Sequence, residues 1–373
     1  MVKTVAGQAG SWPPDFDQQL SKVGCTVPFK TIEIHSNGEI TLCCYTWLPE
    51  FCGNILSDSP QQILDNARRQ DILAGMRQGR FDRCTDHCPR ISQFLMQGSN
   101  PDIVPTEQLA AAVHKAFYHI YLTYDESCNL QCPSCRKNLI VHKLNDTDNP
   151  TVVRLLTIHT KVKQLVQLLL DQGHAVQLNI TGSGDPFASP LYWNYLTELA
   201  AQPQDPRLTL ALCTNGVLMT AATWDSIRAL WPHIASINVS IDAATEQTYK
   251  VVRKNGNFAQ LKHNLDHLDS MIAGGHLPNL HTWTNNFIVQ RDNFRELTQF
   301  IEWQLTYEHL NVIWTNLIAQ WSHITDEEYR DMAIWQQANP HRAELVDMLK
   351  NPVFDDPRIY LGNMSTLRSG VSY

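Results

Sequence analysis

The stretch Cys128-Asn-Leu-Gln-Cys132-Pro-Ser-Cys135 places three cysteines on one short segment, with three residues between the first pair and two between the second. It follows the apolar run from Ala116 to Tyr124, which is a predicted β-strand, so we expect the cysteines on the loop that leaves this strand. Thiolates this close together suit an iron–sulfur centre, because soft sulfur ligands can share one inorganic core. Structural zinc is the competing interpretation, but zinc takes four ligands, usually as two separated pairs, and this loop supplies three.

Composition and charge limit the class of protein. The chain has 373 residues, of which 43% are hydrophobic, enough for a large core and two structural units. Its net charge of −8 has interspersed signs, whereas nucleic-acid binding would leave a basic patch, so we expect no nucleic-acid partner.

The sequence shows neither a membrane span nor a secretory signal, which bears on the cellular compartment. No apolar run reaches the length of about eighteen residues that a membrane span needs, so we expect no membrane partner. The N-terminus, from Met1 to Leu20, has no long apolar core of a secretory signal, which predicts a cytoplasmic protein. Ten cysteines in a reducing compartment indicate metal ligands rather than disulfides, and nine of them lie between Cys25 and Cys135.

A predicted hairpin brings two N-terminal cysteines together. The alternating run Lys30–His35 and the segment Glu39–Leu42 are predicted strands. They are joined at Ser36-Asn-Gly38, because Asn-Gly supplies the positive φ that a tight turn needs. The turn folds the chain back, so Cys25 and Cys43 can meet at one end of the hairpin.

A second pair of cysteines follows a predicted helix, which begins at Pro60 and has a loose apolar face up to Met76. Two pairs brought together in this way make a closed metal site, which zinc could fill on spacing alone. The neighbouring Cys44 is an alternative to Cys43, and Cys52 is interpreted as an inert buried thiol. The proposed ligands are Cys25, Cys43, Cys84 and Cys88.

From residue 115 onward, strand-like and helix-like segments alternate. Six β/α units imply parallel strands with right-handed crossovers, the repeat of a partial TIM-type barrel. We therefore predict an α/β fold, a partial (β/α)6 TIM-type barrel preceded by a small α+β iron–sulfur-binding domain. The expected strands are His119–Tyr124, Val176–Thr181, Leu208–Cys213, Ile234–Ile241, Trp283–Val289 and Asn311–Asn316.

Three regions are expected along the chain: an iron–sulfur domain at 1–110, the barrel at 111–320 and a C-terminal extension at 321–373. The polar segment Gln97–Pro105 is interpreted as the linker between the first two regions. In the extension, Asp326–Lys350 is predicted to form one or two helices split at Asn339-Pro340. The tail from Pro352 could close the open side of the barrel or cover the substrate.

Special residues fall at the predicted strand ends, where a TIM-type barrel has its site. The turn Thr181-Gly-Ser-Gly-Asp-Pro186 follows the second strand, and its glycines allow a close backbone approach to a ligand. Thr214-Asn215-Gly216 follows the third strand, and Ser240-Ile-Asp242 follows the fourth. Cys213 is interpreted as a strand-end core cysteine, the alternatives being a hydrogen-atom donor or a cluster ligand.

Taken together, these motifs resemble the radical S-adenosylmethionine (AdoMet) enzymes. The triad Cys128, Cys132 and Cys135 is similar to the cysteine signature of that family, which implies a 4Fe–4S cluster whose open iron is chelated by AdoMet. The N-terminal cysteines, with Gly38 and Cys88-Pro89, resemble a SPASM or shortened twitch module, which implies a second, auxiliary 4Fe–4S cluster. In the best-known members that module follows the barrel, whereas here it precedes it.

The resemblance also implies AdoMet contacts at the strand ends. Ser183-Gly184-Asp185-Pro186 is similar to the family's Gly-Gly-Glu-Pro motif, which holds the AdoMet amino group. Ser240 and Asp242 resemble the residues near the ribose and the carboxylate, and Val289 lies where a family member packs the adenine. One departure is Ser134, where an aromatic residue often touches the adenine. The other implied cofactor-binding residues are Asn215 and Arg253.

The implied reaction is reductive cleavage of AdoMet to a 5′-deoxyadenosyl radical, which removes a hydrogen atom from an unactivated C–H bond. Enzymes with such modules often act on ribosomally made precursor peptides, by cross-linking, epimerisation or backbone excision, and this is our leading hypothesis. The alternatives are a small-molecule substrate, such as a sugar or amino acid, and a non-catalytic iron–sulfur scaffold. Expected partners are the precursor peptide, a separate peptide-recognition protein, and an electron donor such as flavodoxin or ferredoxin.

Overall fold

The computed structural model describes residues 14–85, 88–113, 117–321 and 323–369. The start of the chain, on which the expectation about a secretory signal depends, lies outside these ranges, as does Ala116 at the start of the first predicted barrel strand. Among the described residues, no helix combines the length and apolar character needed to cross a membrane.

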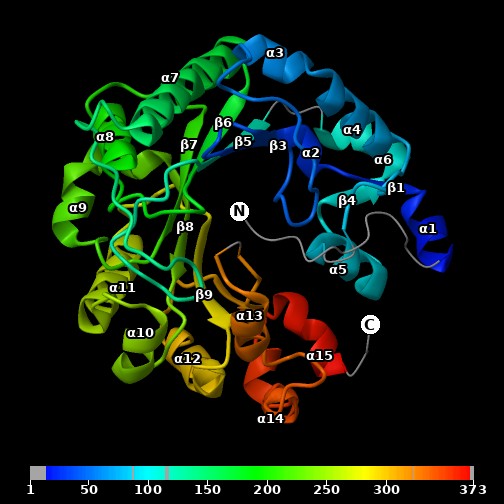
Figure 1. The fold of residues 1–373 in the computed structure, drawn as a ribbon, viewed down its shortest axis with the longest axis vertical. Coiled ribbons are helices and arrows are strands. Elements are labelled where there is room, and N and C mark those ends of the chain that lie inside the picture. Colours follow the sequence, from blue (N-terminus) through cyan, green and yellow to red (C-terminus); the bar gives the residue numbers. More distant parts are fainter. Residues whose placement is uncertain (1–13, 86–87, 114–116, 322, 370–373) are drawn as a thin grey trace.

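A nine-stranded sheet forms the centre of the molecule (Figure 1). Neighbouring strands are parallel from β11 through to β2, and only the last pair, β2 with β3, is antiparallel. The six strands predicted for the barrel are confirmed as β5 to β10, in sequential order. Across the sheet the strands are β11 (Ile359–Tyr360), β10 (Val312–Leu317), β9 (Thr282–Val289), β8 (Ile234–Ser240), β7 (Leu208–Thr214), β6 (Ala175–Ile180), β5 (Phe117–Thr123), β2 (Thr31–His35) and β3 (Ile40–Thr41).

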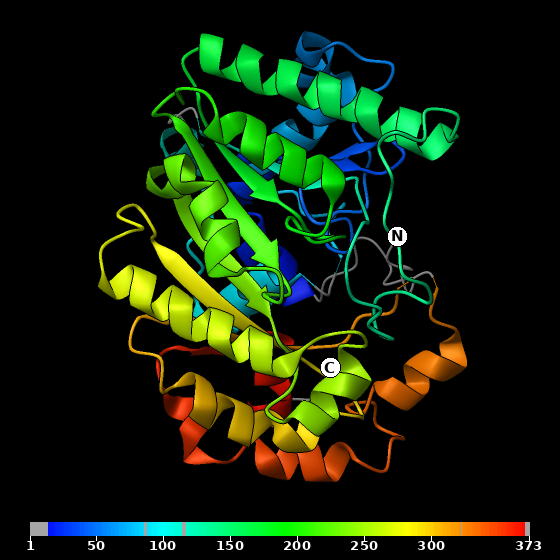
Figure 2. The same cartoon turned by 90° about the vertical axis from the view of Figure 1, so that its left-hand side faces the viewer.

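Helices cover the outer face of this sheet, which gives the partial TIM-type barrel (Figures 1 and 2). The longest begins where the Asn149 side chain accepts a hydrogen bond from Thr151 N and Pro150 occupies the first turn. The covering elements are α7 (Pro150–Asp171), α8 (Pro190–Ala200), α9 (Ala221–Ser226), η1 (Arg228–His233), α10 (Glu246–Val252), α11 (Phe258–Ala273), η2 (Phe294–Glu296) and α12 (Leu297–Gln304).

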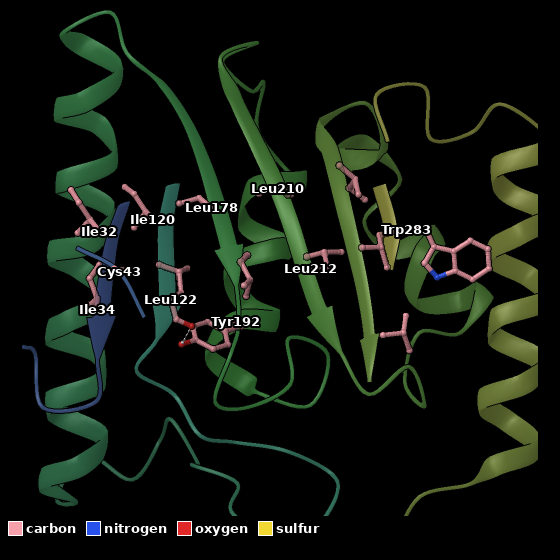
Figure 3. Packing of buried hydrophobic residues seen from close by; sticks show 14 of the residues in the cluster. Ile32, Ile34, Cys43, Ile120, Leu122, Leu178, Tyr192, Leu210, Leu212 and Trp283 are labelled. Atoms are coloured by element: carbon pink, nitrogen blue, oxygen red, sulfur yellow. Dashed lines mark hydrogen bonds between the residues drawn. The ribbon is translucent and has the colours of Figure 1, made fainter. Parts of the chain in front are cut away.

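The two faces of the sheet differ in chemistry. Side chains alternate along each strand, and the set that faces the helices is apolar and buried (Figure 3). The opposite set forms the inner face, which is mostly polar and half-exposed along β6, β7 and β8. Buried helix-facing residues include Ile32, Ile34, Ile120, Leu122, Leu178, Leu210 and Leu212.

The predicted N-terminal hairpin is confirmed, and it joins the barrel sheet. Gly38 has a φ of +84° at the turn, and Ile34 pairs with Ile40 across it. β2 pairs in parallel with β5, so the hairpin that leads to Cys43 extends the sheet at the β5 edge. The helix predicted from Pro60 is instead two helices, α3 (Pro60–Asp65) and α4 (Ala67–Arg77). Asn66 divides them because its side chain caps α4.

The segment interpreted as a linker, Gln97–Pro105, is instead part of the N-terminal unit. Its last residues form β4 (Ile103–Pro105), which pairs in antiparallel fashion with β1 (Val23–Cys25) and so holds Cys25. Its prolines did not rule this out, because Pro105 ends a short edge strand, where no further ladder hydrogen bond is needed. The remaining elements here are α1 (Pro14–Leu20), α2 (Val27–Lys30), α5 (Pro89–Gln97) and α6 (Thr106–Val113).

The C-terminal extension covers the other edge of the sheet. The predicted split at Asn339-Pro340 is confirmed, and β11 then adds a short parallel strand to β10. Burial raises the pKa of Tyr360 on β11, and Arg90 and Cys88 of the N-terminal unit also influence it. The C-terminal extension is therefore close enough to the N-terminal unit for their charges to interact. The elements are α13 (Asp326–Met332), α14 (Arg342–Met348), η3 (Pro352–Asp355), η4 (Gly362–Met364) and α15 (Ser365–Ser369).

Candidate iron–sulfur and AdoMet sites

The cysteine triad lies on the loop that follows β5, at the carboxyl edge of the parallel sheet. Asp125 anchors the start of this loop. Its fully buried carboxylate accepts hydrogen bonds from Ser127 N, Ser127 Oγ and, at 2.5 Å, from Ser189 Oγ at the start of α8. Sequence reasoning missed Asp125, although a carboxylate placed between a strand and the first cysteine was a usable signal.

Hydrogen-bond donors from three segments point at the sulfurs. Cys128 Sγ accepts from Leu130 N at 3.4 Å and from Asn215 Nδ2 at 3.7 Å. Arg253 Nη1 lies 3.6 Å from Cys132 Sγ. Donors of this kind favour the thiolate form, which is the form that binds metal.

The third sulfur also has a cationic neighbour. Arg136 Nη2 donates to Cys135 Sγ at 3.5 Å and to the carbonyl of Ser183 at 2.6 Å, so one guanidinium joins the cysteine loop to the turn after β6. Burial alone would lower the pKa of Arg136, but the neighbouring cysteines, Cys135 first among them, raise it overall, and the guanidinium stays charged.

The thiols of the triad have the chemistry of ligands to a multi-iron core. Among the residues that the structure describes, no three His, Cys, Asp or Glu side chains converge on one metal-ion position. Burial raises the pKa of Cys128 to about 11 and also raises that of Cys132. A neighbouring cysteine of the loop adds to the increase in each case. A cluster distributes such ligands over separate iron atoms, and its positive charge releases their protons.

The turn after β6 packs directly against the cysteine loop. A Cβ at Gly184 would lie 2.5 Å from the carbonyl oxygen of Ser127 and 2.6 Å from that of Asp125, so only glycine fits. Ser183 Oγ donates to the carbonyl of Thr123 at 2.8 Å. The Ser183–Pro186 turn is therefore brought beside the triad, as its resemblance to an AdoMet motif requires.

Asp185 has its acceptor capacity taken up by the protein. Its carboxylate is 0% exposed and accepts from Thr214 Oγ1 at 2.7 Å, Asn215 N at 2.9 Å, Phe187 N at 3.0 Å and Ala188 N at 3.2 Å. It therefore positions the turns after β6 and β7 relative to each other, and any ligand group there must use backbone atoms or other side chains.

The end of β8 is held by two carboxylates. Asp242 has a φ of +63°, accepts from Ile288 N at 2.8 Å, and pairs with Arg253 at 2.7 Å. Glu296, just before α12, accepts from Ala244 N at 2.7 Å and from the Thr245 hydroxyl at 2.6 Å. Glu296 was not predicted as a site residue, because only the tertiary fold brings it to this turn.

The direction of the side chain decides how Val289, Cys213 and Ser240 can take part in a site on the inner face. Val289 is 0% exposed and lies on the helix-facing side with Phe287, whose ring packs 4.8 Å from Phe300 of α12. The Val289 side chain therefore does not point to the inner side, where the half-exposed Ile288 does, and the assignment of Val289 to the adenine stays a prediction. Cys213 pairs in register with Asn238 on the inner face and is not part of the helix-facing core. Ser240 is also on the inner face.

The four N-terminal cysteines line one enclosed space, together with Trp47, Met76 and Phe81. Burial raises the pKa of each thiol, to about 12 for Cys25. Cys44 lies outside this lining, which favours Cys43 as the ligand. Cys52 is 1% exposed and donates to the carbonyl of Ile40, as an inert buried thiol would.

Comparison with known families agrees with this arrangement. A model described as the radical SAM superfamily (SAM being AdoMet) matches residues 125–303, from Asp125 past the end of β9. A SPASM iron–sulfur cluster-binding domain matches residues 25–89, which contain the four cysteines of the enclosed space. These two matches support a radical SAM enzyme that carries a SPASM module before its barrel.

Individual relatives are distant. The chain is 22% identical over 198 residues to the GTP 3′,8-cyclase of Vibrio parahaemolyticus, and it spans about half the length of that relative (53% of each chain). Two solved structures are similar to parts of it. The radical SAM methyltransferase TsrM from Kitasatospora setae has a TM-score of 0.35 and 14% identity, over 59% of this chain and 39% of that one. Methylornithine synthase has a TM-score of 0.36 and 11% identity, over 66% and 65%.

Proposed function

We propose that this radical SAM enzyme modifies a peptide, using a cluster on Cys128, Cys132 and Cys135 and an auxiliary cluster in the SPASM module. When bound, the cluster and AdoMet together supply a 5′-deoxyadenosyl radical for abstracting a substrate hydrogen atom. The observation that carries the AdoMet assignment is the direct packing of the Ser183–Pro186 turn on the cysteine loop.

The protein's own groups orient and enclose the cofactors. Arg253, Arg136 and Asn215 direct N–H groups at the three sulfurs, so they hold the charge of a thiolate-bound cluster. Asp185 and Glu296 have their carboxylates occupied by strand-end loops, so they position those loops and are not proposed to react.

A peptide substrate is supported by the chemistry of the inner face. The strands β5 to β10 carry no lysine or arginine, so they offer no cation to a triphosphate such as the GTP that names the relative's activity. Carboxamides stand there instead, and each can donate to and accept from a peptide group. They include Gln177, Asn179, Asn238 and Asn286.

The proposal includes partners. A one-electron donor such as flavodoxin or ferredoxin would serve the cluster on the triad, and a separate protein would recognise the leader of a precursor peptide. The hairpin that leads to Cys43 begins with β2, which pairs with β5, and the triad follows β5. An auxiliary cluster in the enclosed cysteine space would therefore be held by the same sheet as the cluster on the triad.

The first test is 5′-deoxyadenosine formation by anaerobically reconstituted protein given AdoMet and dithionite. A variant with Cys128, Cys132 and Cys135 all changed to Ala is the control. Formation by the wild type alone supports radical initiation, and equal formation by both proteins contradicts the assignment of the triad.

The second test concerns the substrate. Short peptides encoded beside the gene are added, and their masses are followed together with 5′-deoxyadenosine. A mass change that needs AdoMet supports the peptide proposal. Stimulation by sugars, amino acids or GTP, but by none of the peptides, would favour the small-molecule alternative.

A further inference from the structure

Glu33 is an isolated charge on the sheet. Across the nine described strands of the main sheet, aspartate, glutamate, lysine and arginine occur once in total, as Glu33 on β2. Its neighbours Ile32 and Ile34 are 0% exposed and face the helices, so the carboxylate points to the inner face. An acidic group therefore stands on a surface whose other strand residues are uncharged polar side chains, apolar side chains and a few histidines.

The side chains next to Glu33 form a row across three strands. Glu33 pairs in register with Tyr121 of β5, and Tyr121 pairs with Asn179 of β6. Tyr121 is 37% exposed, which is unusual for so large an apolar ring and leaves its face available to a ligand. The row thus places a carboxylate, an aromatic ring and a carboxamide side by side.

The protein does not neutralise this carboxylate. In the described part of the chain, no lysine or arginine lies within ion-pair distance of it. Burial raises the pKa of Glu33 to about 7, with a smaller opposing effect from the Thr123 hydroxyl. Arg90, which influences Tyr121, is already paired with Asp102 at 2.6 Å, and Cys44 is a further acidic neighbour.

Other strands present polar atoms that lack partners. Buried side-chain atoms of His119, Thr209, Asn286 and Trp314 make no hydrogen bond among the described residues. They come from β5, β7, β9 and β10, and the structure gives no reason within the protein to bury them unpaired. Because these atoms have almost no accessible surface, they offer no contact to a ligand on the inner face, and the accessible groups of the row are those of Glu33 and Tyr121.

We propose that Glu33 and the ring of Tyr121 bind a cationic nitrogen of the substrate, an ammonium or a guanidinium group. The carboxylate supplies the counter-charge, and the ring face adds a cation–π contact. This inference rests on the proposed function, since it names the part of a peptide that the inner face selects. Lysine, arginine or a free N-terminus could each provide the group.

The location suits a substrate held between the two cysteine sites. Tyr121 is near enough to Cys43 for the thiol to influence its pKa, after the larger effect of burial. The triad follows the same strand, β5, at its carboxyl end. A substrate anchored through its cation at Glu33 would therefore lie beside the SPASM module while extending along β5 toward the triad.

The test is a binding titration that needs no turnover. Reconstituted holoprotein is titrated with n-butylammonium, n-butylguanidinium and n-butanol by saturation-transfer difference NMR. We expect saturable, millimolar binding of both cations and at least tenfold weaker binding of butanol. Glu33→Gln should weaken cation binding at least tenfold, whereas Glu39→Gln on the same hairpin should not change it. Tyr121→Leu should weaken it, and Tyr121→Phe, which keeps the ring, should not.

Several results would overturn the inference: equal cation binding by Glu33→Gln and wild type, butanol binding as tight as butylammonium, or no saturable binding by the wild type. Iron content and unfolding temperature confirm that each variant is folded. Three peptides then identify the source of the cation: N-acetylated with one lysine, N-acetylated with one arginine, and a free N-terminus with norleucine. Because AdoMet cleavage is not measured, a failed radical assay and a failed titration are separate outcomes.

Discussion

Arg253 connects the end of β8 to the cysteine loop. Its Nη2 lies 2.7 Å from Asp242 Oδ2, and its Nη1 lies 3.6 Å from Cys132 Sγ. Both side chains of the pair are largely buried, at 12% and 3% exposure. One guanidinium thus pairs with a buried carboxylate and donates to the sulfur of a proposed cluster ligand. Its removal is therefore expected to change both the stability of the protein and the properties of the cluster.

Changing Arg253 to Gln should destabilise the protein by about 3–5 kcal/mol, because it leaves Asp242 buried without its partner. It should also shift the potential of the triad cluster to more negative values, because a positive charge beside Cys132 is lost. Anaerobic denaturant unfolding and a redox titration followed by EPR measure the two effects. Arg228→Gln is the matched control, since its pair with Asp225 is exposed and is expected to contribute about 0–1 kcal/mol. Equal losses in the two variants would contradict the role given to Arg253.

Asp185→Asn tests the link between the turns after β6 and β7. An amide has one acceptor oxygen, whereas both oxygens of Asp185 accept from two donors each. At least one pair of buried donors would then face an NH2 group, at a cost of about 1–3 kcal/mol for each unsatisfied donor. We expect lower stability and weaker AdoMet binding, because Asn215 loses its support beside Cys128. Unchanged AdoMet affinity, measured by equilibrium dialysis, would show that the turn does not depend on Asp185.

Much of this fold could be predicted because its signals are local. Period-two apolar runs marked the six barrel strands, and the Asn-Gly turn marked the hairpin. The cysteines were found because their spacing alone restricts the metal chemistry. Strand-end turns followed from the rule that parallel strands place their carboxyl ends at one edge.

The remaining features depend on information that only tertiary contacts supply. Asn66 divides a predicted helix by capping its second half, and β4 pairs with a strand eighty positions earlier in the chain. Val289 was assigned to the site by position at a strand end, but strand register decided that it faces the helices. Glu296 holds a turn that follows β8, and no short motif identifies such a role.

A third prediction separates the cysteines of the SPASM module. Changing Cys84 and Cys88 to Ala should remove roughly four of eight irons and spare the cluster on the triad. Cys44→Ser should keep the full iron content, because Cys44 lies outside the enclosed space that the four ligands line. Iron analysis with EPR of the reduced proteins measures both. Loss of the auxiliary signal in Cys44→Ser, with Cys43→Ser unaffected, would exchange the roles of the two neighbours.

The last prediction uses the ionisation of Glu33. Its pKa is about 7 in the folded protein against 4.5 for an ordinary glutamate, so the folded state holds a proton that the unfolded chain releases between these values. The folded state therefore loses stability relative to the unfolded state as pH rises through this window, and the penalty is complete above pH 7. Glu33→Gln removes it, so the variant should gain about 1–3 kcal/mol over wild type at pH 8 relative to pH 4. Urea unfolding of both proteins at the two pH values measures this, and comparing the differences cancels any loss of packing. A difference that does not change with pH would mean that Glu33 titrates as an ordinary exposed carboxylate, and that the inner face does not hold an uncompensated charge.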